Sequence, residues 1–144
     1  MEKHRVHPDF YLSLLDFLMT AKQHLVSIGA EFGLTSIQAV TLMLIDEARP
    51  RPMKNFCTLF HCDASNITGI VDGLEQKGLV SRQNSPTDRR VKTIQLEQPG
   101  KRMQEQIIER LASDNDFLFA ALTDDETRQF VHIVEKLAAT KKSA

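Results

Sequence analysis

The sequence predicts a mainly α-helical protein that carries one small β-hairpin. Six segments place apolar residues at the three- and four-residue steps of an amphipathic helix. After Gly78 the pattern changes to that of two short strands, separated by a charged and turn-rich loop. A chain of 144 residues with these elements suits one domain, or one small domain with helical extensions.

Composition and charge narrow the class of protein. No stretch approaches the ~20 apolar residues of a bilayer span, and the N-terminus lacks a signal-type apolar block. Two cysteines are too few for a secreted disulfide scaffold, so we expect a cytoplasmic protein without a membrane partner. Residues 49–102 hold ten Lys and Arg against five Asp and Glu, a local charge of +5 that leaves −6 for the two ends. A basic middle is typical of a DNA-binding module, although chance clustering of solvated charges gives the same pattern.

The first helix is predicted from Pro8 to about residues 29–33, because proline suits a first helical turn and two glycines follow the periodic segment. Thr35 and Gln38 then form a capping box for a second helix, which the proline pair beginning at Pro50 stops. Gly100 precedes a fifth helix, and a second capping box near residue 123 precedes a sixth.

The middle of the chain has the spacing of a helix-turn-helix. Pro52 begins a short third helix, His61 and Cys62 make the turn, and Asp63 is the expected N-cap of a fourth helix over Ser65–Lys77. Two short helices joined by about four residues fit that motif. The strands over 79–84 and 91–96 would then form a wing beside it.

The terminal helices carry more apolar surface than so small a middle can cover. We therefore expect a two-fold homodimer made by both ends; the alternative is an intramolecular three-helix cluster. The predicted organisation is an N-terminal dimerisation region over 1–34, a winged helix-turn-helix DNA-binding lobe over 35–98 and C-terminal dimerisation helices over 99–144.

Opposite its apolar stripe, the fourth helix has a small polar face. Ser65, Asn66, Thr68 and Gly69 are candidate DNA-binding residues, because hydroxyl, amide and helix-terminal N–H groups bind phosphates or read base edges. Gly69 and Gly73 each cost about 1 kcal/mol in a helix interior relative to Ala. Close approach to a DNA backbone would explain that cost, and a merely weakened helix is the alternative.

The hairpin carries the second set of candidate DNA contacts. Arg89 and Arg90 lie at the tip, where a guanidinium suits a narrow minor groove, and Asp88 is close enough to orient one of them. Arg82 and Lys92 on the flanking strands are expected to neutralise phosphates.

The run from Asp63 to Arg82, followed by Asp88-Arg89-Arg90 and Pro99-Gly100, resembles the MarR family of bacterial winged-helix regulators. The likeness covers nearly the whole chain. It implies a dimeric, sequence-specific transcriptional regulator of double-stranded DNA, a repressor released by a small-molecule effector. It also implies that the fourth helix is the recognition helix, that Asp88 steadies the wing and that Arg90 enters the minor groove.

The recognition helix departs from that family in two ways. Glycines stand where its recognition helix often carries basic residues, and Asp72 would repel phosphate unless it accepts a hydrogen bond from a cytosine amino group. Affinity is therefore expected to depend on the wing and on further candidate phosphate contacts. These are Thr35, Ser36, Arg51 and Lys54.

Two other functions fit the sequence. Cys57 and Cys62 flank the end of the third helix, so thiol oxidation could shift the recognition helix of a redox-sensing regulator. A winged helix can also serve protein–protein contact. The sequence has no phosphate-binding loop, nucleophile elbow or zinc-type spacing, so we expect no catalytic residues, no cofactor and no metal site.

Overall fold

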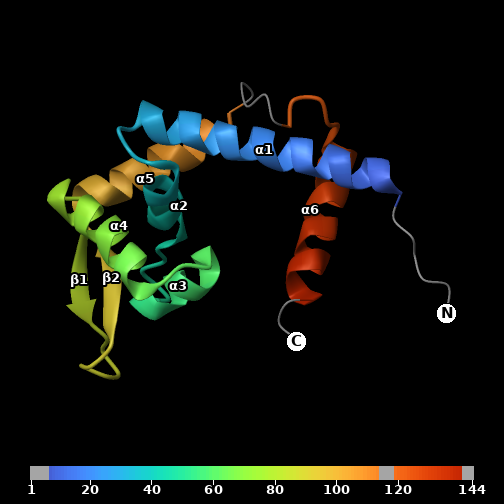
Figure 1. Ribbon diagram of the computed structural model, residues 1–144. Coiled ribbons are helices and arrows are strands. Elements are labelled where there is room, and N and C mark those ends of the chain that lie inside the picture. The colour runs from blue at the N-terminus through green and yellow to red at the C-terminus, as the bar shows by residue number, and fades with distance from the viewer. Residues whose placement is uncertain (1–6, 114–118, 141–144) are drawn as a thin grey trace. The chain divides into compact units, whose positions relative to one another are not determined.

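The computed structural model describes residues 7–113 and 119–140 (Figure 1). The chain divides into two compact units, Met1–Leu111 and Ala112–Ala144. The second unit contains α6 (Asp124–Thr140), and the first contains every other helix and both strands. In chain order these are α1 (Pro8–Glu31), α2 (Ser36–Leu44), α3 (Met53–Phe60), α4 (Ala64–Gln76), β1 (Val80–Asn84), β2 (Lys92–Leu96) and α5 (Gln98–Leu111). The mainly α architecture with one small hairpin is confirmed.

Short-range capping sets where these elements begin and end. The Thr35 hydroxyl accepts from the Gln38 N–H at 3.2 Å, and the Gln38 side chain accepts from the Thr35 N–H at 3.1 Å, which confirms the predicted capping box of α2. α4 ends in a Schellman motif, in which Gly78 at φ 68° donates to the Glu75 carbonyl and Leu79 donates to that of Leu74. The turn after α4 therefore points the chain into β1.

The core of the first unit is built from buried residues of the helices α1 to α5 and of the hairpin. Leu42, Val71, Leu74 and Ile107 are completely buried there. Gly100 holds α5 against the start of the wing, because a Cβ at this position would lie 1.9 Å from the Leu79 carbonyl oxygen. Helix α4 and the wing are thus placed by one continuous apolar core.

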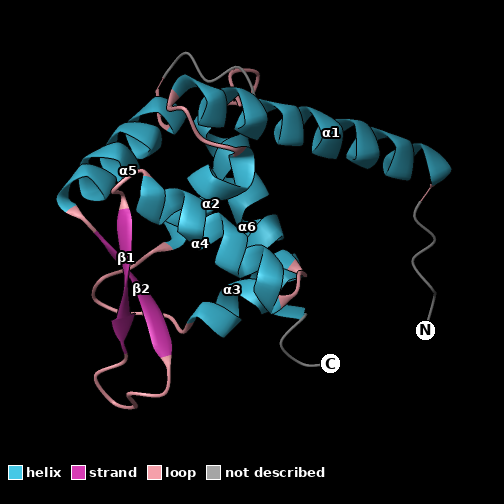
Figure 2. Ribbon diagram, turned by 60° about the vertical axis from the view of Figure 1, so that its left-hand side comes forward, coloured by secondary structure: helices cyan, strands magenta, loops and turns pink. Residues whose placement is uncertain are grey.

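The wing is an antiparallel pair whose register joins Val80 to Leu96 and Asn84 to Lys92. An isolated bridge between Pro52 and Thr93 ties β2 to the start of α3. Both views show the hairpin projecting from the helices of this unit with its loop at the far end (Figures 1 and 2). The predicted strands begin one residue too early, because Leu79 belongs to the Schellman turn and Val91 to the loop.

Among the described residues, exposed large apolar side chains are most numerous on α1 and α6, which belong to different units. In the first half of α1 they include Phe10, Leu12, Leu15 and Met19, and α6 exposes a further four aliphatic side chains. Among the described residues, no single helix is long and apolar enough for a bilayer span; α1 and α2 reach that mark only when taken together across an 84° bend.

Candidate nucleic-acid interface

Helix α4 exposes the polar face that the sequence predicts. Ser65, Asn66, Thr68 and Gly69 are exposed, while Ile67 on the opposite face is buried in the core. The Thr68 hydroxyl donates to the Ala64 carbonyl at 2.9 Å, which leaves the hydroxyl oxygen free to accept. Among these side chains, the Asn66 amide can both donate and accept at a base edge.

Asp63 occupies the N-terminus of α4. Its carboxylate accepts from the Asn66 N–H at 2.9 Å and from the Ser65 hydroxyl at 2.7 Å. These hydrogen bonds, that of Ser65 first, lower the pKa of Asp63 below its ordinary value. The negative charge that the helix dipole favours here is therefore already supplied by the protein.

The two glycines of α4 have different surroundings. A Cβ on Gly69 would meet nothing within 4 Å, whereas one on Gly73 would lie 2.4 Å from the side-chain nitrogen of Gln38 on α2. Packing against the α2 capping box therefore accounts for Gly73. Nothing within the described chain requires a glycine at 69.

At the wing tip, Asp88 orients Arg90. The Asp88 carboxylate accepts from the Arg90 N–H at 3.0 Å and from the guanidinium at 3.2 and 3.3 Å. The side-chain bonds from Arg90, followed by its backbone bond, lower the pKa of Asp88. The Arg90 side chain is still 90% exposed, so its charge is presented to solvent in a fixed direction. Arg89 is exposed and makes no hydrogen bond or ion pair with any residue that the structure describes.

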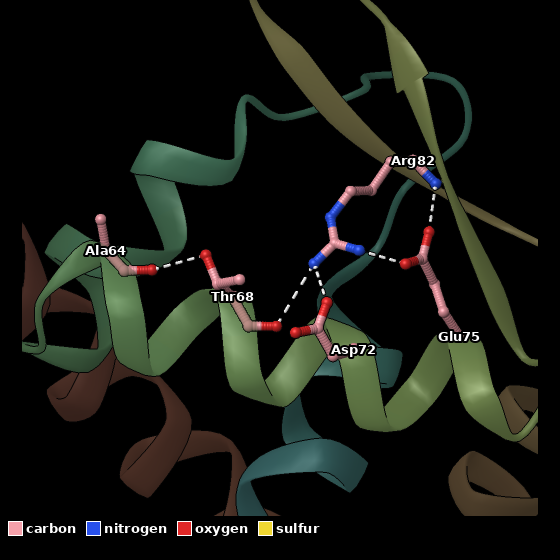
Figure 3. A network of polar contacts seen from close by, with 5 residues as sticks. All are labelled: Ala64, Thr68, Asp72, Glu75 and Arg82. Carbon is pink, nitrogen blue, oxygen red and sulfur yellow. Dashed lines mark hydrogen bonds and ion pairs between the residues drawn. The ribbon is translucent and has the colours of Figure 1, made fainter.

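The two strand cations that were predicted to bind phosphate have different partners. Lys92 is exposed and donates to the Asn84 side chain at 2.6 Å, at the end of the hairpin next to its loop. Arg82 instead faces α4, where its guanidinium bonds Glu75 and Asp72 (Figure 3). Its predicted phosphate contact stays a prediction, and its observed partners are two carboxylates of the same chain.

Glu75 is the residue of this region that the sequence analysis missed. Its carboxylate accepts from both the backbone N–H and the side chain of Arg82. The available signal was its helical phase, because Glu75 lies three residues after Asp72 and the two share one side of α4.

The four further candidate phosphate contacts lie at the starts of α2 and α3. Thr35 is engaged in the α2 capping box, and Ser36 follows it as a half-buried residue. Arg51 and Lys54 are exposed beside the α3 start, and neither has an ion-pair partner among the residues that the structure describes. Within residues 7–113 and 119–140, no three His, Cys, Asp or Glu side chains are grouped so as to hold a metal ion.

The cysteines are free and half-buried. Burial first, and then the nearby Cys57 and Asp63, raise the pKa of the Cys62 thiol. A reactive redox thiol needs the opposite shift, so the geometry gives the redox alternative no support.

A helix-turn-helix followed by an arginine-tipped hairpin defines a winged helix-turn-helix protein. Comparisons with known proteins agree. The MarR family model matches residues 34–92. The regulator MhqR of Bacillus subtilis is 27% identical over 110 residues, which cover 76% of each chain. The repressor YetL of the same organism is 27% identical over 131 residues, which cover 90% of this chain and 78% of the relative.

Solved structures share the same fold. A mutant MarR from E. coli, crystallised in complex with operator DNA, matches with a TM-score of 0.72 at 21% identity, covering 90% of this chain and 94% of that one. In sequence, the chain is therefore similar to MarR-family regulators, and the MarR family model matches its residues 34–92; the solved structure shows that it shares their fold.

Proposed function

We propose that the protein is a dimeric transcriptional regulator that binds a specific site in double-stranded DNA and represses transcription until a small-molecule effector releases it. The observation that carries the proposal is the Asp88–Arg90 pair. It holds an exposed guanidinium at the tip of a hairpin, beside a recognition helix whose outer face is polar. A guanidinium fixed in this way suits insertion into a narrow minor groove.

Replacing Arg90 by Ala tests this proposal. The variant should lose roughly 1–3 kcal/mol of binding to a DNA site selected from a random pool by the wild-type protein. Arg128→Ala is a matched control, because Arg128 is an exposed arginine paired with Asp125 on α6, away from the wing in sequence. Unchanged affinity in Arg90→Ala would contradict the minor-groove assignment.

Salt dependence distinguishes DNA binding from a winged helix used for protein contact. Binding that releases counterions from phosphates weakens steeply between low and moderate salt, whereas an apolar protein contact does not. The selected DNA site should also contain two half-sites about one helical turn, ~34 Å, apart.

The dimer is supported by the exposed apolar side chains of α1. Phe10, Leu12, Leu15 and Met19 are each more than half exposed in a single chain. A second copy that covers them would remove this apolar surface from water. We assign the dimerisation regions to 1–34 and 99–144 and the DNA-binding lobe to 35–98. Leu15→Glu should shift sedimentation toward the monomer, and Gln23→Glu, on an exposed polar position of α1, should not.

The effector has a candidate groove between α1 and α2, of about 310 Å³. It is lined mainly by aliphatic side chains, with Lys22 and Ser36 as its polar members. A small phenolic or amphipathic molecule fits this combination, because its ring would contact the apolar wall and its polar group would reach Lys22. Val40→Trp should fill the groove and weaken release from DNA by such a compound, while DNA binding without it is retained.

A further inference from the structure

We propose that Arg82 is a positioning residue for DNA binding, which fastens the wing to the recognition helix through Asp72 and Glu75. These three residues are here termed the Arg82 clamp. The inference rests on the proposed DNA-binding function, and it replaces the phosphate contact that the sequence predicts for Arg82.

The clamp begins at the edge of the hairpin. The Arg82 N–H donates to one Glu75 oxygen at 2.9 Å, and the Arg82 guanidinium donates to the other oxygen of the same carboxylate. One glutamate thus satisfies both the main chain and the side chain of a single β1 residue. Because a backbone N–H that is partly shielded from water needs a protein partner, this hydrogen bond fixes where β1 meets α4.

The second half of the guanidinium extends the clamp along the helix. Its Nη2 atom donates to Asp72 at 2.5 Å and to the Thr68 carbonyl at 3.3 Å. Thr68, Asp72 and Glu75 are spaced by four and three residues, so Arg82 spans two turns of one face of α4 (Figure 3). A planar guanidinium with several donors can bridge these acceptors, whereas an ammonium group cannot do so in one geometry.

Exposure distinguishes this arginine from the one at the wing tip. The Arg82 side chain is 25% exposed, and that of Arg90 is 90% exposed. Both terminal nitrogens of the Arg82 guanidinium are already bonded to acceptors on α4. The Arg90 guanidinium is exposed to solvent, so Arg90 is a stronger candidate than Arg82 for a contact in a DNA groove.

The charge balance gives the clamp a role in affinity. Asp72 is half exposed on the recognition helix and Glu75 is close to it, so the clamp has two negative charges and one positive charge. Removing Arg82 would leave two uncompensated carboxylates where DNA phosphates approach. Arg82 therefore supports DNA binding without touching DNA, by holding the wing and by screening α4.

A mutant cycle tests the proposal with the folded, full-length protein and the DNA site selected by the wild type. Arg82→Ala should weaken binding roughly tenfold, within the range measured for coupled neighbours. In a background carrying Asp72→Asn and Glu75→Gln, the same change should weaken binding much less. An equal loss in both backgrounds would overturn the proposal, because a direct phosphate contact does not depend on those carboxylates.

The salt series gives an independent readout. DNA affinity falls with salt, so the slope of log K against log salt is negative, and losing one phosphate contact reduces its magnitude by about one. In the background carrying Asp72→Asn and Glu75→Gln, where neither carboxylate is left to repel phosphate, Arg82→Ala should keep the slope of that background, and a slope smaller in magnitude by about one would overturn the proposal.

Arg82→Lys guards against a folding defect, because it keeps the charge and the strand. It should bind DNA more weakly than the wild type, because lysine keeps the charge but cannot bridge the three acceptors, with an unchanged circular dichroism spectrum and sedimentation coefficient. Wild-type affinity in this variant would also overturn the clamp, since a lysine can replace an arginine at a phosphate but not across three acceptors. Failure of the proposed function would look different, because the wild-type protein would then select no DNA site from the random pool; failure of the clamp alone leaves that binding intact.

Discussion

Replacing Gly69 by Ala should make the protein more stable and its DNA complex weaker. A Cβ at this position meets no atom within 4 Å, so the folded chain accepts the methyl group without rearrangement. Alanine in a helix interior is favoured over glycine by about 1 kcal/mol. We therefore expect the free energy of unfolding to rise by up to about 1 kcal/mol.

Gly73→Ala is the matched control on the same helix. Its Cβ would lie 2.4 Å from the Gln38 side-chain nitrogen, so the amide must move. That movement weakens the bond from the Thr35 N–H to Gln38, at a cost of about 0.5–1.5 kcal/mol. The loss offsets the gain in helix propensity, and the net change in stability should be close to zero.

Urea unfolding measures the change in stability of Gly69→Ala and of its control. The protomer concentrations must be equal, because the stability of a dimer depends on concentration. Fluorescence anisotropy with the selected DNA site measures the affinity of each variant for DNA. If α4 approaches DNA closely at Gly69, the added methyl should weaken binding roughly tenfold, the usual cost of overfilling a packed contact. Wild-type DNA affinity in a stabilised Gly69→Ala protein would refute the close approach.

Three further outcomes follow from the geometry. Gly100→Ala should lower the urea midpoint by the equivalent of about 1–3 kcal/mol, because its Cβ meets the Leu79 backbone at 1.9 Å and neither segment can yield; a wild-type midpoint would contradict this packing. An NMR titration should place the pKa of Asp88 below its ordinary value of about 3.9, and the pKa should be higher in Arg90→Ala. The Asp88–Arg90 pair therefore stabilises the folded state at pH values above that ordinary pKa, and this stabilisation is lost as the pH falls through the pKa of the folded protein. Equal titration midpoints of Asp88 in the wild type and in Arg90→Ala would exclude the pair in solution. Because burial raises its pKa, Cys62 should react with iodoacetamide at pH 7 more slowly than the thiol of an unstructured cysteine peptide. Faster alkylation would restore the redox alternative.

Features that depend on neighbours in the sequence could be predicted from it. The capping box of Thr35 and Gln38 and the glycine stop at Gly78 each need a few consecutive residues, and both are confirmed. The Asp88–Arg90 geometry likewise joins residues two positions apart. Such local hydrogen bonds are determined by backbone conformation rather than by the tertiary fold.

Features that depend on packing could not be predicted in this way. Gly69 and Gly73 look equivalent in the sequence, but one faces open space and the other packs against α2. Arg82 looks like any strand cation that faces solvent. Its partners lie seven and ten residues away on a helix, so its role depends on the angle between β1 and α4.

The placement of charge implies that the two parts of the interface do different work. The exposed acidic residues of α4 and its cap are Asp63 and Asp72, whereas Arg89, Arg90 and Lys92 place positive charge on the wing. Counterion release, and with it most of the affinity for any DNA sequence, should therefore come from the wing. The exposed face of α4 offers hydroxyl and amide groups and the open surface at Gly69, so it contributes little charge attraction to DNA. It can instead distinguish DNA sequences by hydrogen bonds to base edges and by close contact. Arg82 connects the two parts, which is why its loss should affect both affinity and the precision with which the recognition helix is placed.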